Sequence, residues 1–344
     1  MTRANPQRPI PPEPILRAKG LNVVYEPARG ARIWPVRDVS LELAEGEFAG
    51  LVGESGCGKS TLGYALTRML RPPAKLESGS IWFGGTDITA LEGEELRRHR
   101  RGGFALVLQS GMNALNPVRT VEGHFADVFR AHRRAGPHAT LAQELLDRVH
   151  LPAATLRRYP HELSGGMRQR VAIAVALALG PRLVVFDEPT TALDVIVQGA
   201  VMDTIRELQR DAGFTALLIS HDLGLVLEAT DRVLVMYAGR IVEDRPSAGL
   251  TGDPGAGGAR HPYTRALLRC YGDPRADEVH IEGIPGSPPD LSQPPGGCPY
   301  VPRCPLAEPV CGQSDPDLTR RGNGATACHV AAREAEPAKD HDAG

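Results

Sequence analysis

The sequence predicts an α/β fold in which a mostly parallel sheet is covered by helices on both faces, and three observations lead to it. Short apolar runs typical of buried strands, such as residues 183–186 and 233–237, alternate with stretches of helical periodicity. A glycine-rich turn joins the strand-like residues 46–52 to a helix-like run. The composition, 42% hydrophobic and 23% charged over 344 residues, is typical of a globular chain of one or two domains.

The glycine-rich turn is the strongest signal for function. Residues 53–61 read GESGCGKST and match the pattern G-x-x-x-x-G-K-[ST] without a mismatch. Glycines let the backbone wrap around an anion and point N–H groups at phosphate oxygens. Lys59 can reach the β and γ phosphates, and the Ser60 hydroxyl can bind Mg²⁺. The expected ligands of the nucleotide here are Gly53, Ser55, Gly56, Cys57, Gly58, Lys59, Ser60 and Thr61.

Further strands are expected before and after this turn. Residues 15–25 and 36–43 have strand-like apolar character, and the stretch between them predicts an antiparallel hairpin. Residues 79–83 predict another strand followed by a turn, and residues 103–108 a short apolar strand.

Helical periodicity dominates the middle of the chain. It begins near residue 110 and continues to about residue 170, with prolines as punctuation. Residues 195–213 predict an amphipathic helix stopped by Gly213, and residues 215–220 the next strand.

Composition divides the chain into four parts. Residues 1–13 predict a disordered, proline-rich lead, and residues 14–250 the main domain. Glycine and proline rise over residues 251–331, which indicates a separate, loop-rich module. Residues 332–344 predict a disordered polar tail.

Two carboxylates follow the buried strand at residues 183–186. Ligands bind at the carboxyl ends of parallel strands, so Asp187 and Glu188 are expected at the nucleotide. We expect Asp187 to hold Mg²⁺, directly or through water, and Glu188 to polarise the attacking water as general base.

Residues 163–170, LSGGMRQR, precede the next helix. Ser164, Gly165 and Gly166 there can form a second anion site from a hydroxyl, backbone N–H groups and the positive end of a helix. With the motifs above, this run resembles the signature motif of the ATP-binding-cassette (ABC) ATPases. The resemblance implies a P-loop NTPase (RecA-like) core with an antiparallel β subdomain and a helical subdomain at about 110–170. It also implies a head-to-tail dimer in which the signature motif contacts ATP held by the other subunit.

The residues that this family has at its other nucleotide contacts are also present in the sequence. The resemblance implies that Gln109 contacts Mg²⁺ and water near the membrane subunit and that His221 contacts the γ-phosphate. It implies that Asp194 acts across the dimer and that Tyr25 stacks on adenine. The expected catalytic residues are therefore Lys59, Gln109, Glu188 and His221.

Further stretches are similar to one branch of this family. Residues 109–117, residues 159–162 and the run HPYT at 261–264 resemble the ATPase subunits of oligopeptide and dipeptide importers. This implies two membrane permease subunits, an extracytoplasmic solute-binding protein and a second ATPase subunit, identical or different. It places the chain at the cytoplasmic face of the membrane. Import of nickel or another small solute, and a soluble cassette ATPase without permeases, are the alternatives.

Four cysteines lie close together near the C-terminus: Cys298, Cys304, Cys311 and Cys328. Their spacing, C-x5-C-x6-C-x16-C, lacks the close C-x2–4-C pairs common in zinc sites. The resemblance implies an [4Fe–4S] cluster, and Pro305 after Cys304 matches ferredoxin-type Cys-Pro steps. Structural Zn²⁺ and free or bridged thiols are the alternatives.

Charge and hydropathy exclude two classes of function. A formal net charge of −2 argues against nucleic-acid binding through bulk positive charge. No stretch approaches the ~20 apolar residues of a membrane span, so membrane association is expected only through partners.

Overall fold

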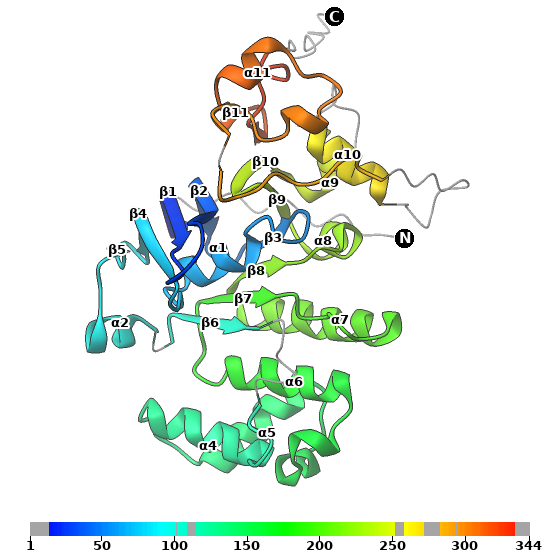
Figure 1. The fold of residues 1–344 in the computed structure, drawn as a ribbon. Coiled ribbons are helices and arrows are strands. Elements are labelled where there is room, and N and C mark those ends of the chain that lie inside the picture. Colours follow the sequence, from blue (N-terminus) through cyan, green and yellow to red (C-terminus); the bar gives the residue numbers. More distant parts are fainter. Residues whose placement is uncertain are drawn as a thin grey trace, which may run out of the picture.

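The computed structural model describes residues 14–100, 102–108, 115–251, 258–271, 283–293 and 295–333. Two sheets form its centre, with helices around them and the last part of the chain stacked on one end (Figure 1). None of the described helices has the length and apolar character that crossing a bilayer needs.

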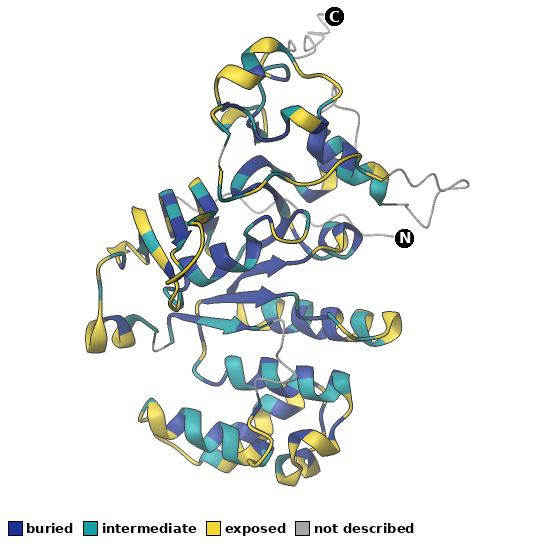
Figure 2. Cartoon of the chain, in the orientation of Figure 1, coloured by how far each residue is buried: buried dark blue, intermediate teal, exposed yellow. Residues whose placement is uncertain are grey.

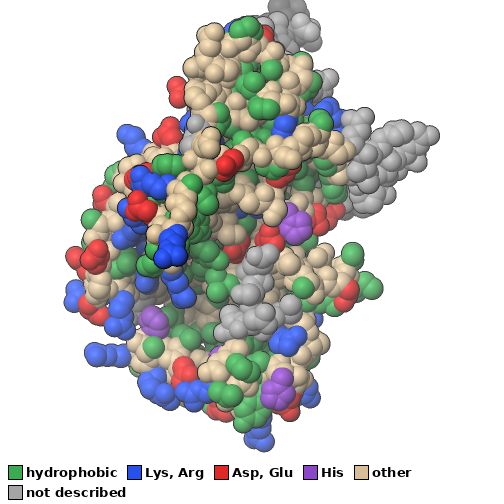
Figure 3. Space-filling model, in the orientation of Figure 1, with side chains coloured by type: hydrophobic (Ala, Val, Ile, Leu, Met, Phe, Trp, Pro, Cys, Tyr) green, Lys and Arg blue, Asp and Glu red, His purple; other side chains and the backbone are tan. Residues whose placement is uncertain are grey.

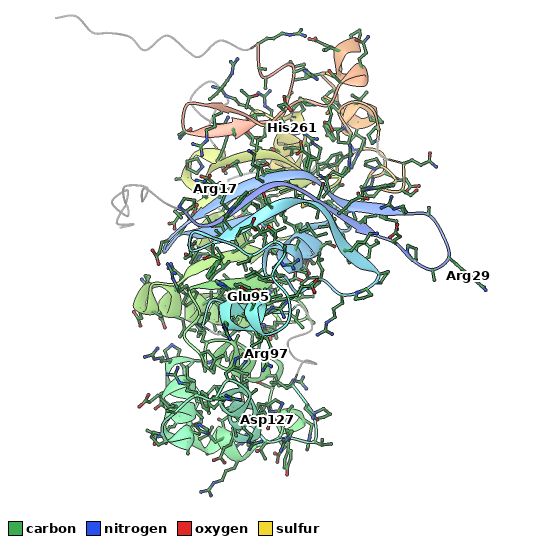
Figure 4. The ribbon with its side chains drawn as sticks, turned by 90° about the vertical axis from the view of Figure 1, so that its left-hand side faces the viewer. Arg17, Arg29, Glu95, Arg97, Asp127 and His261 are labelled. Atoms are coloured by element: carbon green, nitrogen blue, oxygen red, sulfur yellow. The ribbon has the colours of Figure 1, made fainter. Side chains whose placement is uncertain are left out.

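The smaller sheet is antiparallel and contains four described strands in the order β2-β1-β4-β5. They are β1 (Pro14–Tyr25), β2 (Ile33–Ala44), β4 (Ala74–Phe83) and β5 (Thr86–Asp87). Strands β1 and β2 pair with Leu16 opposite Leu43, so the predicted hairpin is confirmed. Figure 4 shows Arg29, in the loop between them, extending away from the body of the protein.

The larger sheet has eight described strands in the order β11-β12-β10-β9-β3-β8-β7-β6. They are β3 (Phe48–Val52), β6 (Phe104–Val107), β7 (Leu183–Asp187), β8 (Thr215–Ile219), β9 (Arg232–Tyr237), β10 (Arg240–Pro246), β11 (Thr319–Arg321) and β12 (Gly324–Thr326). The run from β9 to β6 is parallel, as predicted. Every residue of β3, β7 and β8 is buried, because helices or the smaller sheet cover both faces.

Strand β7 shows how the two faces are used. Val184 and Phe186 belong to one hydrophobic core, whereas Leu183 and Val185 belong to the other. Successive side chains of a strand point to opposite faces, so a continuous apolar run fills both cores. The central strands are accordingly dark in the burial view (Figure 2).

The helices cover the sheets and build a separate layer. The α-helices are α1 (Lys59–Leu66), α2 (Gly93–Arg100), α4 (Val121–Ala131), α5 (His138–Arg148), α6 (Gly165–Ala176), α7 (Val195–Ala212), α8 (Leu223–Ala229), α9 (Ser247–Leu250), α10 (Pro262–Cys270) and α11 (Pro309–Gln313), and the short 3₁₀ turns are η1 (Ala153–Arg157), η2 (Pro160–Glu162) and η4 (Val301–Arg303). Helices α4, α5 and α6 lie together below the sheets in Figure 1. Helix α7 ends at Gly213, whose φ of 67° is the left-handed conformation that glycine adopts without strain.

Charged side chains cover the outer helix α2. Its first turn carries Glu94 and Glu95, and its last turn carries Arg97, Arg98 and Arg100. Glu95 and Arg97 are labelled in Figure 4, and both charge signs are visible over this region in Figure 3. The charges complement the helix dipole, since acidic groups stabilise the N-terminus and basic groups the C-terminus.

We call the described residues from 258 to 333 the C-terminal module. Its strand β12 pairs with β10 and so extends the larger sheet. The buried Glu243 of β10 also accepts hydrogen bonds from the backbone N–H groups of Arg260 and His261 at 2.7 and 3.0 Å. These contacts join residues far apart in the chain, which local composition does not reveal.

Candidate functional site

The glycine-rich turn between β3 and α1 depends on glycine at two positions. Gly53 and Gly58 have φ of 155° and 108°. A Cβ on Gly53 would lie 2.1 Å from the Met236 carbonyl oxygen, and one on Gly58 would lie 1.8 Å from that of Pro35. Both obstacles are backbone, so a larger residue would displace the loop.

The start of α1 is left open for an anion. Gly58 is its N-cap and has no side chain to accept from the first N–H groups. Lys59 is 5% exposed, and its Nζ donates to the carbonyl oxygens of Gly53 and Glu54 at 2.8 and 3.0 Å. The ammonium group therefore lies within the loop, where a triphosphate would meet it.

The residues expected at Mg²⁺ meet beside this loop. Ser60 donates to Asp187 Oδ1 at 2.8 Å. Asp187 Oδ2 is buried and has no close hydrogen-bond partner in the part of the chain that the structure describes, although the Tyr64 hydroxyl also interacts with this carboxylate. Burial raises the pKa of Asp187, whereas the Ser60 hydrogen bond opposes that rise. A hydroxyl beside a buried carboxylate oxygen without a close partner fits a hard divalent cation.

The expected general base and the expected γ-phosphate contact touch each other. His221 Nδ1 lies 3.3 Å from Glu188 Oε1, and Thr191 Oγ1 donates to Glu188 Oε2 at 2.9 Å. Glu188 has a φ of 46°, which is unusual for a residue with a side chain and marks a strained, fixed backbone. The carboxylate is thus held at the end of β7 by two partners.

Three further residues were expected at the nucleotide: Tyr25, Cys57 and Gln109. The hydroxyl groups of Tyr25, the last residue of β1, and Thr61 of α1 lie 3.1 Å apart. This places the tyrosine beside the phosphate loop. Cys57 of the loop is buried, and burial raises the pKa of its thiol. Gln109 lies outside the described residues.

The signature residues are not brought to the phosphate loop within one chain. Ser164 caps α6 and is exposed, and Asp194 caps α7 and is exposed. Gly165 is half-buried, and a Cβ on the buried Gly166 would lie 2.5 Å from Val197 Cγ1 of α7. In Figure 1, α6 and α1 lie on opposite sides of β6 and β7. One chain therefore supplies two separate halves of the expected site.

Two features of the site were not anticipated from the sequence. Thr191 binds Glu188, and its only signal is its place three residues after that carboxylate. Glu54 of the phosphate loop is held by Arg303 at 2.7 and 2.9 Å. No local pattern around Arg303 indicates this, because the two residues are 249 positions apart.

The four cysteines border one small cavity, with room for about one water molecule. Burial raises the pKa of Cys298 to about 11 and also raises the pKa of Cys304, so these thiols are protonated at neutral pH. The Ala331 N–H donates to Cys328 Sγ at 3.5 Å. Among the described residues, no three metal-binding side chains converge closely enough to form a ready site for a metal ion. To bind a metal ion or cluster in this cavity, the thiols would have to lose their protons and move closer together.

Comparisons with known sequences match both parts of the chain. Residues 36–191 match the ABC transporter family, and residues 256–311 match the C-terminal region of oligopeptide/dipeptide transporters. The dipeptide transport ATP-binding protein DppD of Bacillus subtilis is 38% identical over 335 residues, covering 95% of this chain and 97% of that protein. A Brucella melitensis protein, provisionally named a peptide import ATP-binding protein, is 42% identical over 324 residues, covering 89% and 94%.

A solved structure agrees with these matches. The dimeric post-hydrolysis structure of the ATP-binding cassette MJ0796 bound to ADP and Pi has a TM-score of 0.60 and 28% identity, covering 68% of this chain and 99% of that one. The phosphate loop, the paired acidic residues and the match along nearly the whole chain agree. The chain belongs to the ATP-hydrolysing ABC subunits of the oligopeptide and dipeptide transporter family.

Proposed function

We propose that this ATPase drives the uptake of di- and oligopeptides across the cytoplasmic membrane by closing on MgATP as a dimer. The observation that carries the proposal is the assembly of Ser60, Asp187, Glu188 and His221 beside one phosphate loop. The match to the transporter C-terminal region and the names of the relatives support peptides as the cargo.

The proposed chemistry is positioning and charge neutralisation, because phosphoryl transfer needs little covalent help from the protein. Lys59 leaves the carbonyl oxygens of Gly53 and Glu54 to bind the β and γ phosphates. Ser60, Asp187 and Gln109 would hold Mg²⁺, which neutralises charge on the phosphates when bound. Glu188 accepts the proton of the attacking water, and His221 orients the γ-phosphate.

The dimer would complete each site with residues from the partner. Ser164 accepts the Met167 N–H at 3.3 Å with a lone pair, so its O–H remains available to donate to a phosphate oxygen. Val195 and Ile196 follow Asp194 and are 82% and 85% exposed. Apolar side chains at the expected contact across the dimer support burial there by a second ATPase subunit, identical or different.

A permease surface is proposed on the helical layer. Val118 is 78% exposed and Tyr159 is 40% exposed, and the Val121 N–H donates to the Arg158 carbonyl oxygen at 2.9 Å. That hydrogen bond holds the two segments together, and Val118 lies a few positions after Gln109 in the sequence, where the family resemblance places the membrane subunit. An apolar pair at this edge fits a coupling contact with a permease subunit.

The test is co-purification of the tagged chain with its membrane partners. Val118→Glu should abolish recovery of the permease subunits while ATP binding stays within twofold of wild type. Ile33→Glu is the matched control, because Ile33 is an exposed apolar residue of β2 away from this layer. Equal recovery with Val118→Glu and wild type would reject this surface, and absence of membrane partners from the wild type would favour the soluble alternative.

Cargo is tested separately, in vesicles containing the permeases and the solute-binding protein. A panel of di- and oligopeptides should stimulate ATP hydrolysis, whereas Ni²⁺ alone should not. Stimulation by Ni²⁺ and not by peptides would favour the metal-importing alternative.

We further propose that Cys298, Cys304, Cys311 and Cys328 hold an [4Fe–4S] cluster, with Zn²⁺ as the alternative. The proposal is supported by the four thiols that line one cavity and by the family resemblance, and it requires the cavity to widen around the cluster. Anaerobically purified protein should contain iron and labile sulfide and absorb broadly near 400 nm. Cys298→Ser should remove both, whereas Cys270→Ser, outside the cavity, should not. Iron-free protein with one bound Zn²⁺ would support the alternative.

A further inference from the structure

Two residues of the C-terminal module, Arg303 and Tyr263, are hydrogen-bonded to Glu54 of the phosphate loop. Arg303 donates from Nη1 to Glu54 Oε2 at 2.7 Å and from Nη2 to Glu54 Oε1 at 2.9 Å. The backbone N–H of Glu54 donates to the Tyr263 hydroxyl at 2.9 Å. Both the carboxylate and the amide of this loop residue are therefore fixed by side chains more than 200 positions away.

Arg303 is itself held in place. Its side chain is 3% exposed, and its Nε donates to the Pro285 carbonyl oxygen at 2.8 Å. Further hydrogen bonds reach the Ile284 carbonyl oxygen and the Tyr237 hydroxyl, both at 3.3 Å. The bond to Glu54 raises the pKa of Arg303. A planar guanidinium with so many fixed partners positions a carboxylate more narrowly than a lysine could.

Glu54 places a carboxylate in the loop that is expected to bind the triphosphate. A carboxylate in this loop repels an incoming polyanion unless a cation compensates it. Arg303 neutralises the charge through two hydrogen bonds. The Glu54 carbonyl oxygen accepts from Lys59 Nζ at 3.0 Å, so the placement of this residue also bears on the ammonium group that meets the phosphates.

We propose that Arg303 and Tyr263 are positioning residues for the phosphate loop, through which the C-terminal module sets the affinity for MgATP. Arg303 compensates the charge of Glu54, and Tyr263 fixes its backbone. This role concerns the ATP site of the family and does not depend on the cargo.

The test measures the Kd for MgATP and the kcat of hydrolysis with the full-length chain. Arg303→Gln should raise the Kd about tenfold and change kcat at saturating ATP by less than about twofold. Adding Glu54→Gln to this variant should return the Kd to within about threefold of wild type, because the repelling charge is then gone. Tyr263→Phe, which removes only the hydroxyl, should raise the Kd about threefold.

Asp315→Asn is the matched control for docking of the module. Asp315 pairs with Arg240 at 3.1 Å and Arg37 at 3.5 Å, which joins the module to the cassette without touching the loop. This variant should lower the unfolding midpoint and leave the Kd within about twofold. If Arg303→Gln does not fold, Arg303→Lys replaces it, with an expected rise of about threefold.

Three results would overturn the proposal. The first is an unchanged Kd in the folded Arg303 variant. The second is a Kd in the Arg303→Gln, Glu54→Gln double variant as weak as in the single variant. The third is an equal loss of affinity in Asp315→Asn, which would show that any loosening of the module weakens ATP binding.

Discussion

Two helices of this chain begin at glycine-rich turns that are expected to bind phosphate, and their N-terminal ends are capped differently. Helix α1 starts at Gly58, which offers no side-chain cap, and the adjoining Lys59 is buried. Helix α6 starts at Ser164, which caps it and is exposed. The N–H groups at the start of α1 have no side-chain cap and are left for a ligand. At the start of α6, the Ser164 side chain accepts one N–H group, and Ser164 is exposed on the surface. The difference supports the proposal that one chain forms the phosphate cradle and presents its signature turn to a partner chain.

The largest effect is expected from removing the proposed general base beside the phosphate loop. Glu188→Gln should lower kcat about 1000-fold, roughly 4 kcal/mol of barrier, because an amide is a poor proton acceptor. The Kd for MgATP should stay within about threefold, since His221 and Thr191, which hold Glu188, both lie outside the phosphate loop. Steady-state hydrolysis and equilibrium binding measure the two quantities. Hydrolysis close to the wild-type rate would remove Glu188 as general base.

The next effect tests the outward-facing turn. Ser164→Ala should lower kcat about 100-fold, because one donor to developing charge is lost, and should leave the Kd of dilute protein for MgATP nearly unchanged. Thr120→Ala is the control, since Thr120 caps α4 in the same way at 3.2 Å but lies away from both turns. An equal loss of kcat in the two variants would show that Ser164 acts only as a helix cap and not on the phosphate. The wild-type specific activity should also rise with protein concentration, as a shared site requires.

A third prediction compares the glycines themselves by chemical denaturation. Gly58→Ala should destabilise the fold by about 2.5 kcal/mol, because φ is 108° and the Pro35 carbonyl oxygen cannot move aside. Gly166→Ala should cost only about 1 kcal/mol, because it meets the Val197 side chain at 2.5 Å. Adding Val197→Ala should recover most of that smaller loss. Full recovery of Gly58→Ala by any side-chain truncation would contradict the difference.

The last prediction concerns the C-terminal module, which contacts the phosphate loop, and the effect of His261 on its stability at different pH values. His261 is buried, labelled near the base of the module in Figure 4, and burial lowers its pKa to about 3 from 6.5. Its Nδ1 accepts from the Tyr263 N–H at 3.0 Å, so the neutral form caps α10. A lowered folded pKa stabilises the protein above pH 6.5, and this stability is lost as pH falls toward 3. From pH 8 to 5.5 the loss from this group is about 1.4 kcal/mol.

His261→Asn retains a capping oxygen and removes the titrating ring. Urea midpoints measured across this pH range should therefore fall less for the variant than for wild type. Parallel curves for the two proteins would show that His261 does not titrate on unfolding.

The local motifs could be predicted from the sequence because each is a continuous string whose chemistry is set by near neighbours. The phosphate loop, the strand ending in Asp187 and Glu188, and the turn at Ser164 were all placed correctly on their elements. Periodicity and composition likewise predicted the parallel sheet, since buried strands are apolar throughout.

Only the tertiary structure decided the contacts between distant segments. It showed that β12 joins β10, that Arg303 holds Glu54, and that the four cysteines border a cavity without a ready site for one metal ion. Such contacts depend on which surfaces meet once the loops have closed, and no local pattern of residues encodes that outcome. The sequence thus determined what each half of the site is made of, and the packing determined that the C-terminal module reaches the phosphate loop.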